Sequence, residues 1–280
     1  MRRVTAAGRR PRIATASITD ADRLTLVGHL EELRRRLGWT LAALLVATIV
    51  AFAVHGHLLD LLDAPLPASA PDPVTLGVAE PFTTSLRISF WAALALTMPF
   101  ASWQLWAFVA PAFGAARRRT IVALVAASTV LFAAGGAFGY FVALPQSLAF
   151  LVNYDAHHYS VQLRASELYR FNALVLLACG AVFQLPIVLL GLVRFRVIDT
   201  ARLRRNRRVG WAVVAALAVL MPGVDPILTG LTFIPLVVLY EGTVLVATIL
   251  ERRWSRARTS RTGDGHDLDD DRDGDLARAA

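Results

Sequence analysis

The sequence predicts an all-α integral membrane protein with six transmembrane helices in a cupped bundle. Hydrophobic residues make up 56% of its 280 residues, and its mean hydropathy is +0.52. This is too apolar for a single soluble domain, whose surface must be mostly polar. Six apolar runs separated by polar segments supply the candidate helices. A bilayer core of about 30 Å is crossed by roughly 20 helical residues.

The charge pattern predicts how the helices are oriented. All 29 basic residues are arginine: nine precede residue 37, three lie at 117–119, seven lie between 194 and 208, and seven follow residue 250. Segments 59–84 and 222–226 contain none. Because arginine-rich loops stay in the cytoplasm, this alternation and the even number of runs predict that both termini are cytoplasmic.

Each apolar run predicts one helix. The runs cover about 38–58, 86–109, 120–144, 168–192, 208–222 and 227–249. The fifth is short and few residues separate it from the sixth, so we expect a hairpin that thins the bilayer locally. Alternatively, the last two runs form one broken, buried element.

Residues that shape helices predict a bundle that is not straight. Prolines occur in or beside the runs at Pro99, Pro111, Pro145, Pro186, Pro222, Pro226 and Pro235, and each bends or ends its helix. In the third run, Gly135, Gly136 and Gly139 would let a neighbouring helix approach closely. The lone Cys179 in the fourth run can form no intramolecular disulfide, so we expect a small apolar packing residue.

Both ends of the chain are predicted to be disordered cytoplasmic tails around a membrane domain of residues 23–250. Residues 1–22 are rich in Arg, Ala and Thr, and residues 251–280 carry an acidic run with Gly and Arg. Arg34–Arg36 before an apolar stretch mimic a twin-arginine export signal, but five further runs favour a retained first helix.

The most informative segment is His29–Leu37, which places Glu31 and Glu32 among arginines. Apolar residues at 26, 30, 33 and 37 have the spacing of one helical stripe, so the segment can lie on the bilayer surface with both carboxylates on its polar side. Glutamates add nothing to cytoplasmic retention and indicate a further task. The alternative is i,i+4 pairing with Arg35 and Arg36, worth only a few tenths of a kcal/mol per pair.

Three polar side chains at membrane depth are functional candidates, because polar groups are costly there. Gln104 lies near the inner end of the second run, Gln184 lies before Pro186 in the fourth, and Glu241 lies in the inner half of the sixth. The alternatives are an interfacial aromatic belt for Gln104 and a helix-to-helix hydrogen bond for Gln184. Glu241 must be protonated, pair with a neighbour, or face a wet cavity or a partner chain.

The motifs of common enzymes are missing from the sequence, so we predict binding or transport and no catalysis. There is no Walker-type glycine loop, no H-E-x-x-H and no G-x-S-x-G. His55 with His57, and His157 with His158, lack convergent ligands, so neither a metal nor another cofactor is expected. The arginines suit anionic lipid headgroups, and without a basic aromatic platform no nucleic-acid partner is expected.

Short motifs occur in order along residues 24–250. They are His29-Leu30-x-Glu32-Leu33-Arg34-x-Arg36-Leu37; Glu80-x-Phe82 with Arg87; Pro99 followed by Gln104-x-Trp106-x-Phe108-x-x-Pro111; Phe138-x-Tyr140-Phe141 with Pro145; Phe183-Gln184-x-Pro186; Leu203-Arg204 with Arg207-Arg208; Asp225; and Ile234-Pro235 with Glu241. Each is weak alone, but their order resembles the TatC family, the multi-spanning receptor subunit of the twin-arginine protein translocase. The resemblance implies a cupped six-helix fold with short fifth and sixth helices in the cell membrane of a prokaryote.

The resemblance also implies a function and a set of site residues. A member of the family binds the twin-arginine signal peptides of folded precursors and assembles with TatA-like and TatB-like single-span partners and with itself, driven by the proton-motive force. The implied signal-peptide-binding residues are Glu32, Glu31, Arg34, Gln104 and Phe108. The implied intramembrane polar or partner contacts are Gln184, Glu241 and Asp225.

Two positions depart from the family pattern. In the family, a second glutamate in the first cytoplasmic loop helps to bind the signal, and here Arg117 stands where that glutamate is expected. Arginine would repel the signal's own pair. Gln184 stands where relatives often carry glutamate, so it keeps hydrogen bonding without charge. We therefore expect Glu32 to carry most of the recognition.

Three other functions stay open at this point. One is a divergent TatC-like copy with weakened signal binding that works beside another such subunit. The others are a proton-coupled secondary transporter and a lipid-handling membrane enzyme. A transporter would normally show paired internal repeats, and we find no convincing repeat.

Overall fold

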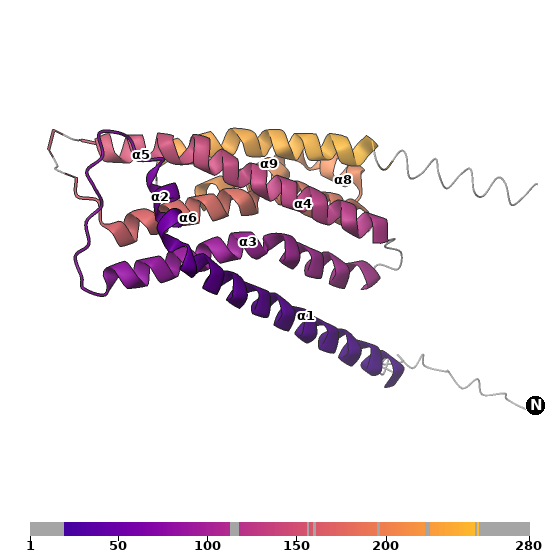
Figure 1. Cartoon of the computed structure of the whole chain (residues 1–280). Coiled ribbons are helices and arrows are strands. Elements are labelled where there is room, and N and C mark those ends of the chain that lie inside the picture. The colour runs from indigo at the N-terminus through magenta and orange to yellow at the C-terminus, as the bar shows by residue number, and fades with distance from the viewer. Residues whose placement is uncertain are drawn as a thin grey trace, which may run out of the picture.

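The computed structural model describes residues 20–112, 118–155, 157–158, 161–194, 197–221, 225–249 and 251. Within these ranges the chain is a bundle of helices. Its β-structure is limited there to one isolated parallel bridge between Val74 and Arg164. Most helices run along a common direction, whereas α1 leans away from the rest (Figure 1). The all-α prediction is confirmed. Of the predicted tails only residues 20–22 and 251 are described, and they are helical.

The first helix begins much earlier than its apolar run. α1 extends over Asp20–Ala53, 34 residues, and α2, His55–Asp63, follows after a turn at Val54. The segment with the two glutamates therefore continues into the membrane helix and is not a separate surface helix. At 1.5 Å per residue α1 is about 50 Å long, so part of it projects beyond an apolar core of about 30 Å.

The middle of the chain forms three long helical stretches, two of them interrupted. α3 covers Glu80–Ala112 and continues through Pro99. α4, Arg118–Phe138, continues through a π-helical segment, Gly139–Ala143, into α5, Leu144–Asn153. α6, Ala165–Val182, and α7, Leu185–Arg194, are separated at Phe183 and Gln184. The break follows from Pro186, which has no N–H to continue the helical hydrogen bonds.

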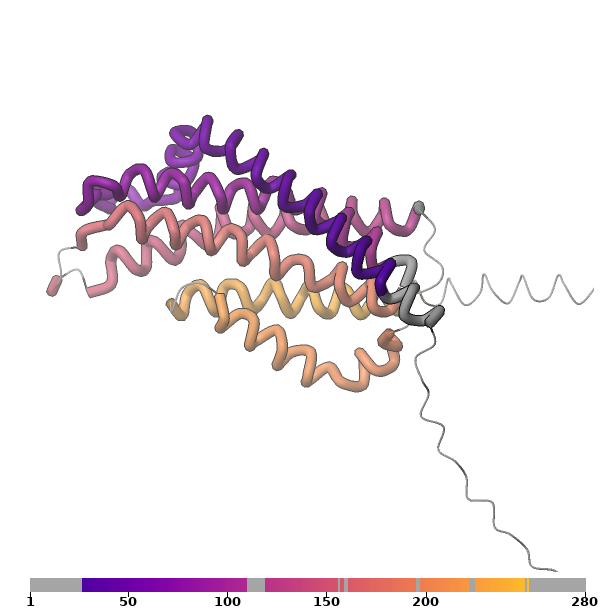
Figure 2. The backbone as a smooth tube through the Cα atoms, turned by 90° about the horizontal axis from the view of Figure 1, so that it is seen from below, coloured from indigo at the N-terminus to yellow at the C-terminus, as the bar shows by residue number. Residues whose placement is uncertain are grey.

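The last two predicted helices form a hairpin with one short arm. α8, Thr200–Arg205, leads into α9, Arg207–Val219, and a C-terminal helix covers Pro226–Ile249. Val214 and Ala218 of α9 share a buried cluster with Leu236 and Tyr240 of the C-terminal helix. The two helices run in opposite directions and stop short of the end that α3 and α6 reach (Figure 2). This arrangement favours the hairpin over one broken element.

Five helical stretches among the described residues are long and apolar enough to cross a membrane. They are Val27–Ala53, Glu80–Val109, Arg119–Asn153, Ala165–Arg194 and Pro226–Ile249. α9, with 13 residues, is only about 20 Å long, so it is shorter than a typical apolar core. The fifth helix is confirmed as short, whereas the prediction of a short sixth helix is wrong, because Pro226–Ile249 has 24 residues and is long enough to span. The chain is a multi-pass helical membrane protein.

Two of the three glycines in the third run allow the close approach that we predict. A Cβ on Gly135 would lie 2.6 Å from the Cys179 carbonyl oxygen, and a Cβ on Gly139 would lie 3.2 Å from the Cys179 Cβ. Cys179 is fully buried in this contact between α4 and α6. Its packing role is confirmed. Gly136 has nothing within 4 Å of its Cβ position, so the prediction is wrong there.

An ion pair between the buried Glu80 and the exposed Arg164 lies at the end of the bundle that is far from the start of α1. Glu80, 7% exposed, accepts hydrogen bonds from Arg164 Nε at 2.9 Å and from the Leu76 backbone N–H at 2.9 Å. The Val74 N–H donates to the Leu163 carbonyl at 2.8 Å beside it. The segment that precedes α3 is therefore tied to the segment that precedes α6.

The described start of α1 and the end of the C-terminal helix lie at the same end of the bundle (Figure 1). α8, the end of α3 and the start of α4 lie there as well. We call this the arginine-rich end, because it carries Arg34–Arg36 of α1 and the arginines of α8 and the first turn of α9.

Candidate functional site

Glu32, Arg36 and Gln104 meet where α1 packs on α3 at the arginine-rich end. Arg36 donates to Glu32 Oε1 from Nε at 2.9 Å and from Nη2 at 2.6 Å, and it donates from Nη1 to Gln104 Oε1 at 3.0 Å. The Arg36 and Glu32 side chains are 23% and 28% exposed. Every nitrogen of the guanidinium is therefore engaged, and Glu32 Oε2 accepts no hydrogen bond from the residues described.

One turn earlier in α1, the His29 ring stacks on Phe108 of α3. Their ring centroids lie 4.1 Å apart and the planes differ by 12°. His29 Nδ1 lies 3.9 Å from Glu32 Oε2, too far for a hydrogen bond but close enough for attraction when the ring is protonated. We refer to His29, Glu32, Arg36, Gln104 and Phe108 as the α1–α3 seam.

The other predicted signal-peptide-binding residues do not join this seam. Glu31 and Arg34 are exposed on α1, and neither forms an ion pair within the part of the chain that the structure describes. Of the two i,i+4 pairs expected on the alternative reading, Glu32–Arg36 is formed and Glu31–Arg35 is not. Arg117, the departure from the family pattern, lies outside the described residues.

Gln184 is held inside the bundle by α4. Its Nε2 donates to the Ser128 carbonyl oxygen at 2.9 Å, and its Oε1 accepts from Ser128 Oγ at 2.8 Å. Ser102 of α3 continues the chain of contacts at 3.1 Å from Ser128 Oγ. Because Gln184 is only 8% exposed, this arrangement is the helix-to-helix hydrogen bond that we consider as its alternative role.

Glu241 pairs with α9. Its Oε2 lies 3.0 Å from Arg207 Nη2, and its Oε1 accepts from Trp211 Nε1 at 3.0 Å. The Glu241 side chain is 28% exposed and borders a hollow of about 750 Å³ that Arg204 and Arg207 also line. Of the situations expected for this residue, the structure shows pairing with a neighbour, and the same side chain also borders a hollow.

Asp225 begins the C-terminal helix. Its Oδ1 accepts from the Leu228 N–H at 2.6 Å, and Ser147 Oγ of α5 lies 3.4 Å away. An aspartate that accepts from an N–H of the first turn, followed by Pro226, is a favourable helix start. Asp225 is 2% exposed, and its Oδ2 has no partner among the described residues.

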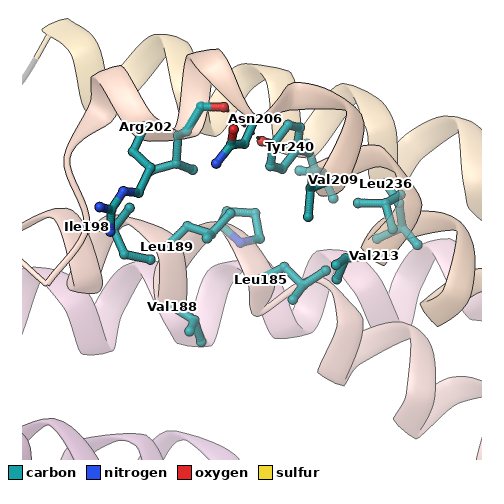
Figure 3. A pocket seen from close by; sticks show the side chains of 15 residues that line it. Leu185, Val188, Leu189, Ile198, Arg202, Asn206, Val209, Val213, Leu236 and Tyr240 are labelled. Atoms are coloured by element: carbon teal, nitrogen blue, oxygen red, sulfur yellow. Dashed lines mark hydrogen bonds between the residues drawn. The ribbon is translucent and has the colours of Figure 1, made fainter.

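An apolar hollow of about 350 Å³ lies between α7, α8, α9 and the C-terminal helix. Figure 3 shows Arg202 and Asn206 toward one end of it and Val213 and Leu236 toward the other. Almost all of the lining residues are apolar. Arg202 is exposed and makes no ion pair with any described residue.

The sequence-based prediction does not include His29 and Arg36 among the site residues. For Arg36 a signal exists, since its i,i+4 spacing from Glu32 predicts the pair. The spacing of residues does not place Gln104 and Phe108 of a different helix against them; only the family resemblance groups these two residues with Glu32, and the structure brings them together. The Glu80–Arg164 pair is missed for the same reason, because its members are 84 residues apart.

These features define a class of protein: a multi-pass helical membrane protein whose charged seam lies where two spanning helices meet at the arginine-rich end. The model of the family described as Sec-independent protein translocase protein (TatC) matches residues 28–235. The chain belongs to this family. It is therefore a subunit of the Sec-independent protein translocase and not an enzyme.

Related proteins and solved structures support the same family. The chain is 33% identical over 235 residues to the protein TatCd of Bacillus subtilis, covering 84% of this chain and 96% of the relative. It is 31% identical to TatC of Campylobacter jejuni, covering 78% and 91%. Two crystal structures of the twin arginine translocase receptor TatC, one of them in the detergent DDM, are 28% identical, with TM-scores of 0.70 and 0.68. They cover 78% and 79% of this chain and 99% and 98% of their own.

Proposed function

We propose that this subunit binds the twin-arginine signal peptides of folded precursor proteins at the α1–α3 seam, with Glu32 as the principal carboxylate. The observation that carries the proposal is that Glu32 already binds an arginine, Arg36, through hydrogen bonds of 2.9 and 2.6 Å. Partial desolvation at the edge of the bilayer strengthens such charge-assisted bonds. The solved relatives are described as twin arginine translocase receptors, which supports the same function.

The neighbours of Glu32 suit a second guanidinium. Gln104 presents an amide oxygen beside the carboxylate, and the His29–Phe108 stack adds aromatic rings next to it. A planar guanidinium can hydrogen-bond to the first and stack on the second, which a lysine ammonium does less well. Glu31 and Arg34, both exposed, are placed by the proposal at the outer rim of the same site.

We further propose that the loaded subunit nucleates an export complex with TatA-like and TatB-like single-span subunits and with further copies of itself, driven by the proton-motive force. The half-exposed Glu241–Arg207 pair supports a partner contact, because it borders the hollow of about 750 Å³ on the C-terminal helix. Gln184 and Asp225 are buried, so we expect them to act on partners only through the helices that they position.

We propose six membrane crossings with both termini in the cytoplasm, α9 being the short one. The arginine-rich segments at one end of the bundle support this orientation. Single cysteines introduced by Ser69→Cys and Arg205→Cys test it, since Cys179 is buried. In intact cells a membrane-impermeant maleimide should label only position 69. Labelling of position 205 alone would contradict this orientation and indicate the opposite one.

We propose an anionic phospholipid as an additional partner, at the hollow of Figure 3. An acyl chain suits the apolar lining, and the phosphate suits the exposed Arg202 at its end. Arg202→Gln should reduce the anionic lipid that copurifies with the chain, as measured by native mass spectrometry, more than Arg205→Gln does. Equal lipid retention in both variants would show that Arg202 does not contribute to lipid binding.

Export of a reporter with a twin-arginine signal tests the central proposal. The chain is expressed as the only TatC-like subunit in a host with single-span partners. We expect export, and we expect Glu32→Gln to reduce it at least tenfold, since loss of a charge-assisted contact costs about 1.5–3 kcal/mol. Glu31→Gln is the matched control and should have a smaller effect. Robust export with Glu32→Gln would refute the assignment.

The divergent-copy alternative makes the opposite prediction for the unmodified chain. With Arg117 in the expected acidic position, such a copy exports nothing by itself, and Arg117→Glu restores export. Uptake of a small solute by the purified chain alone would instead favour a transporter.

A further inference from the structure

We propose that Arg36 is a built-in competitor of the twin-arginine ligand, which must displace it from Glu32. The inference rests on the proposed function and concerns the state of Glu32 before a ligand binds. Arg36 donates two hydrogen bonds to Glu32 Oε1, so the carboxylate is already neutralised by a guanidinium of the same chain. Binding of a ligand therefore exchanges one arginine for another on a single carboxylate.

The geometry provides both a first contact for the ligand and a place for the displaced arginine. Both Arg36 bonds end on Oε1, which leaves Glu32 Oε2 open to an incoming guanidinium within the described residues. Gln104 Oε1 already accepts from Arg36 Nη1 at 3.0 Å. Arg36 can thus release Glu32 while it keeps its bond to α3, so its guanidinium is not left without a partner.

This exchange explains how a strong acidic site is compatible with the many other arginines at this end of the bundle. An uncompensated carboxylate there would attract any cation, whereas a paired one yields only to a ligand that makes better bonds. The ligand gains when it brings two guanidiniums and further contacts along the seam. A single surface arginine gains nothing over Arg36.

A purely structural role for Arg36 predicts the opposite effect of its removal. If Arg36 only ties α1 to α3, its loss loosens the seam and weakens ligand binding. If Arg36 competes with the ligand, its loss frees Glu32 and tightens binding. The sign of the change in affinity therefore separates the two roles.

The experiment measures binding of a fluorescent synthetic peptide, with an Arg-Arg pair followed by an apolar stretch, to the full-length chain in lipid nanodiscs. Fluorescence anisotropy gives Kd for Arg36→Leu and for Arg35→Leu. Arg35 is exposed and makes no ion pair with the described residues, so its replacement changes net charge equally without freeing Glu32. We expect Arg36→Leu to bind roughly tenfold more tightly than Arg35→Leu, the equivalent of about one charge-assisted interaction.

Two further variants keep the outcome interpretable. Glu32→Gln combined with Arg36→Leu should abolish the gain, because the freed carboxylate is gone; a gain that persists would overturn the proposal. Arg36→Gln, which keeps a polar side chain of similar length, replaces Arg36→Leu if the latter elutes as an aggregate, and it should also tighten binding.

The failure of this inference is distinguishable from that of the proposed function. Weaker or unchanged binding in the Arg36 variants, together with weaker binding in Glu32→Gln, overturns the competitor role alone. Unchanged binding in Glu32→Gln overturns the function proposed for Glu32 and the competitor role with it. A peptide with Lys-Lys in place of Arg-Arg is the control for non-specific electrostatic attraction.

Discussion

Trp106 lies directly over Gly191, where its indole ring occupies the space that a side chain at position 191 would need. Trp106 comes from the end of α3 and Gly191 from α7, so the contact brings together two spanning helices near the arginine-rich end. Trp106 is only 8% exposed. The α3 helix that carries Gln104 and Phe108 is thus positioned by a glycine in a different span.

Gly191→Ala should therefore destabilise the protein. The added methyl group forces the indole ring to move, and overpacking of this kind typically costs about 1–3 kcal/mol. The midpoint of thermal unfolding in detergent measures the loss. Gly136→Ala is the matched control, because a Cβ there has nothing within 4 Å. Equal stability of the two variants would contradict the contact.

Gln184→Leu should destabilise the bundle by about 1–2 kcal/mol. The substitution removes both hydrogen bonds that join Gln184 to Ser128, and interhelical bonds in membranes contribute about this much. Chemical unfolding in mixed micelles measures the change. Gln146→Leu in α5 replaces an exposed glutamine and should be near neutral. If the two variants lose the same stability, the buried network contributes nothing specific.

Asp225→Ala should loosen the start of the C-terminal helix at a cost of about 0.5–2 kcal/mol, the usual range for loss of a helix cap. Asp225→Asn retains an oxygen for the Leu228 N–H and should recover most of that loss. Hydrogen–deuterium exchange of the amides at 228–230 reports the local effect. Faster exchange confined to other helices would argue against a capping role.

Asp63 gives the protein a pH-dependent stability of unusual sign. Burial raises the pKa of its carboxyl and the nearby Asp60 charge adds to this, although the hydrogen bond from Tyr169 at 2.9 Å lowers it. The native state therefore holds a proton more tightly than the unfolded chain. The resulting stabilisation is full below the unfolded pKa, near pH 4, and is lost as pH rises through the native pKa.

Unfolding midpoints from pH 4 to pH 8 test the Asp63 prediction. Asp63→Asn removes the titrating group and should flatten the fall in stability across the lower part of this range. Asp72→Asn removes an exposed aspartate and should leave the fall unchanged. A fall of the same size in both variants would assign the pH dependence to another group.

Much of the fold follows from the order of apolar and charged residues. Runs of apolar residues predict the helices, since an unpaired backbone is not tolerated in lipid. Their limits are less well predicted: α1 starts near Asp20 and not near residue 38, because a polar helix end can extend into water without leaving the helix. The break before α7 follows from Pro186, whereas α3 continues through Pro99.

The candidate site is only half predictable. Glu32 and Arg36 lie one helical turn apart, so their spacing predicts the contact, although the same spacing does not pair Glu31 with Arg35. Gln104 and Phe108 reach the same place from α3, 68 residues further along the chain in the case of Gln104. Their side chains meet those of α1 only because the two helices pack together there.

The order of residues along the chain was enough to predict the membrane class, the family and the Glu32–Arg36 pair, because hydropathy, charge asymmetry and i,i+4 spacing are properties of neighbouring residues. Tertiary structure alone decided that Arg36 bridges Glu32 to Gln104, that Gln184 is satisfied by Ser128 and that Glu80 pairs with Arg164. Each of these contacts joins different helices or loops. Their partners are selected by packing between helices, which depends on the shape of every side chain in the interface and leaves no periodic signal along the chain.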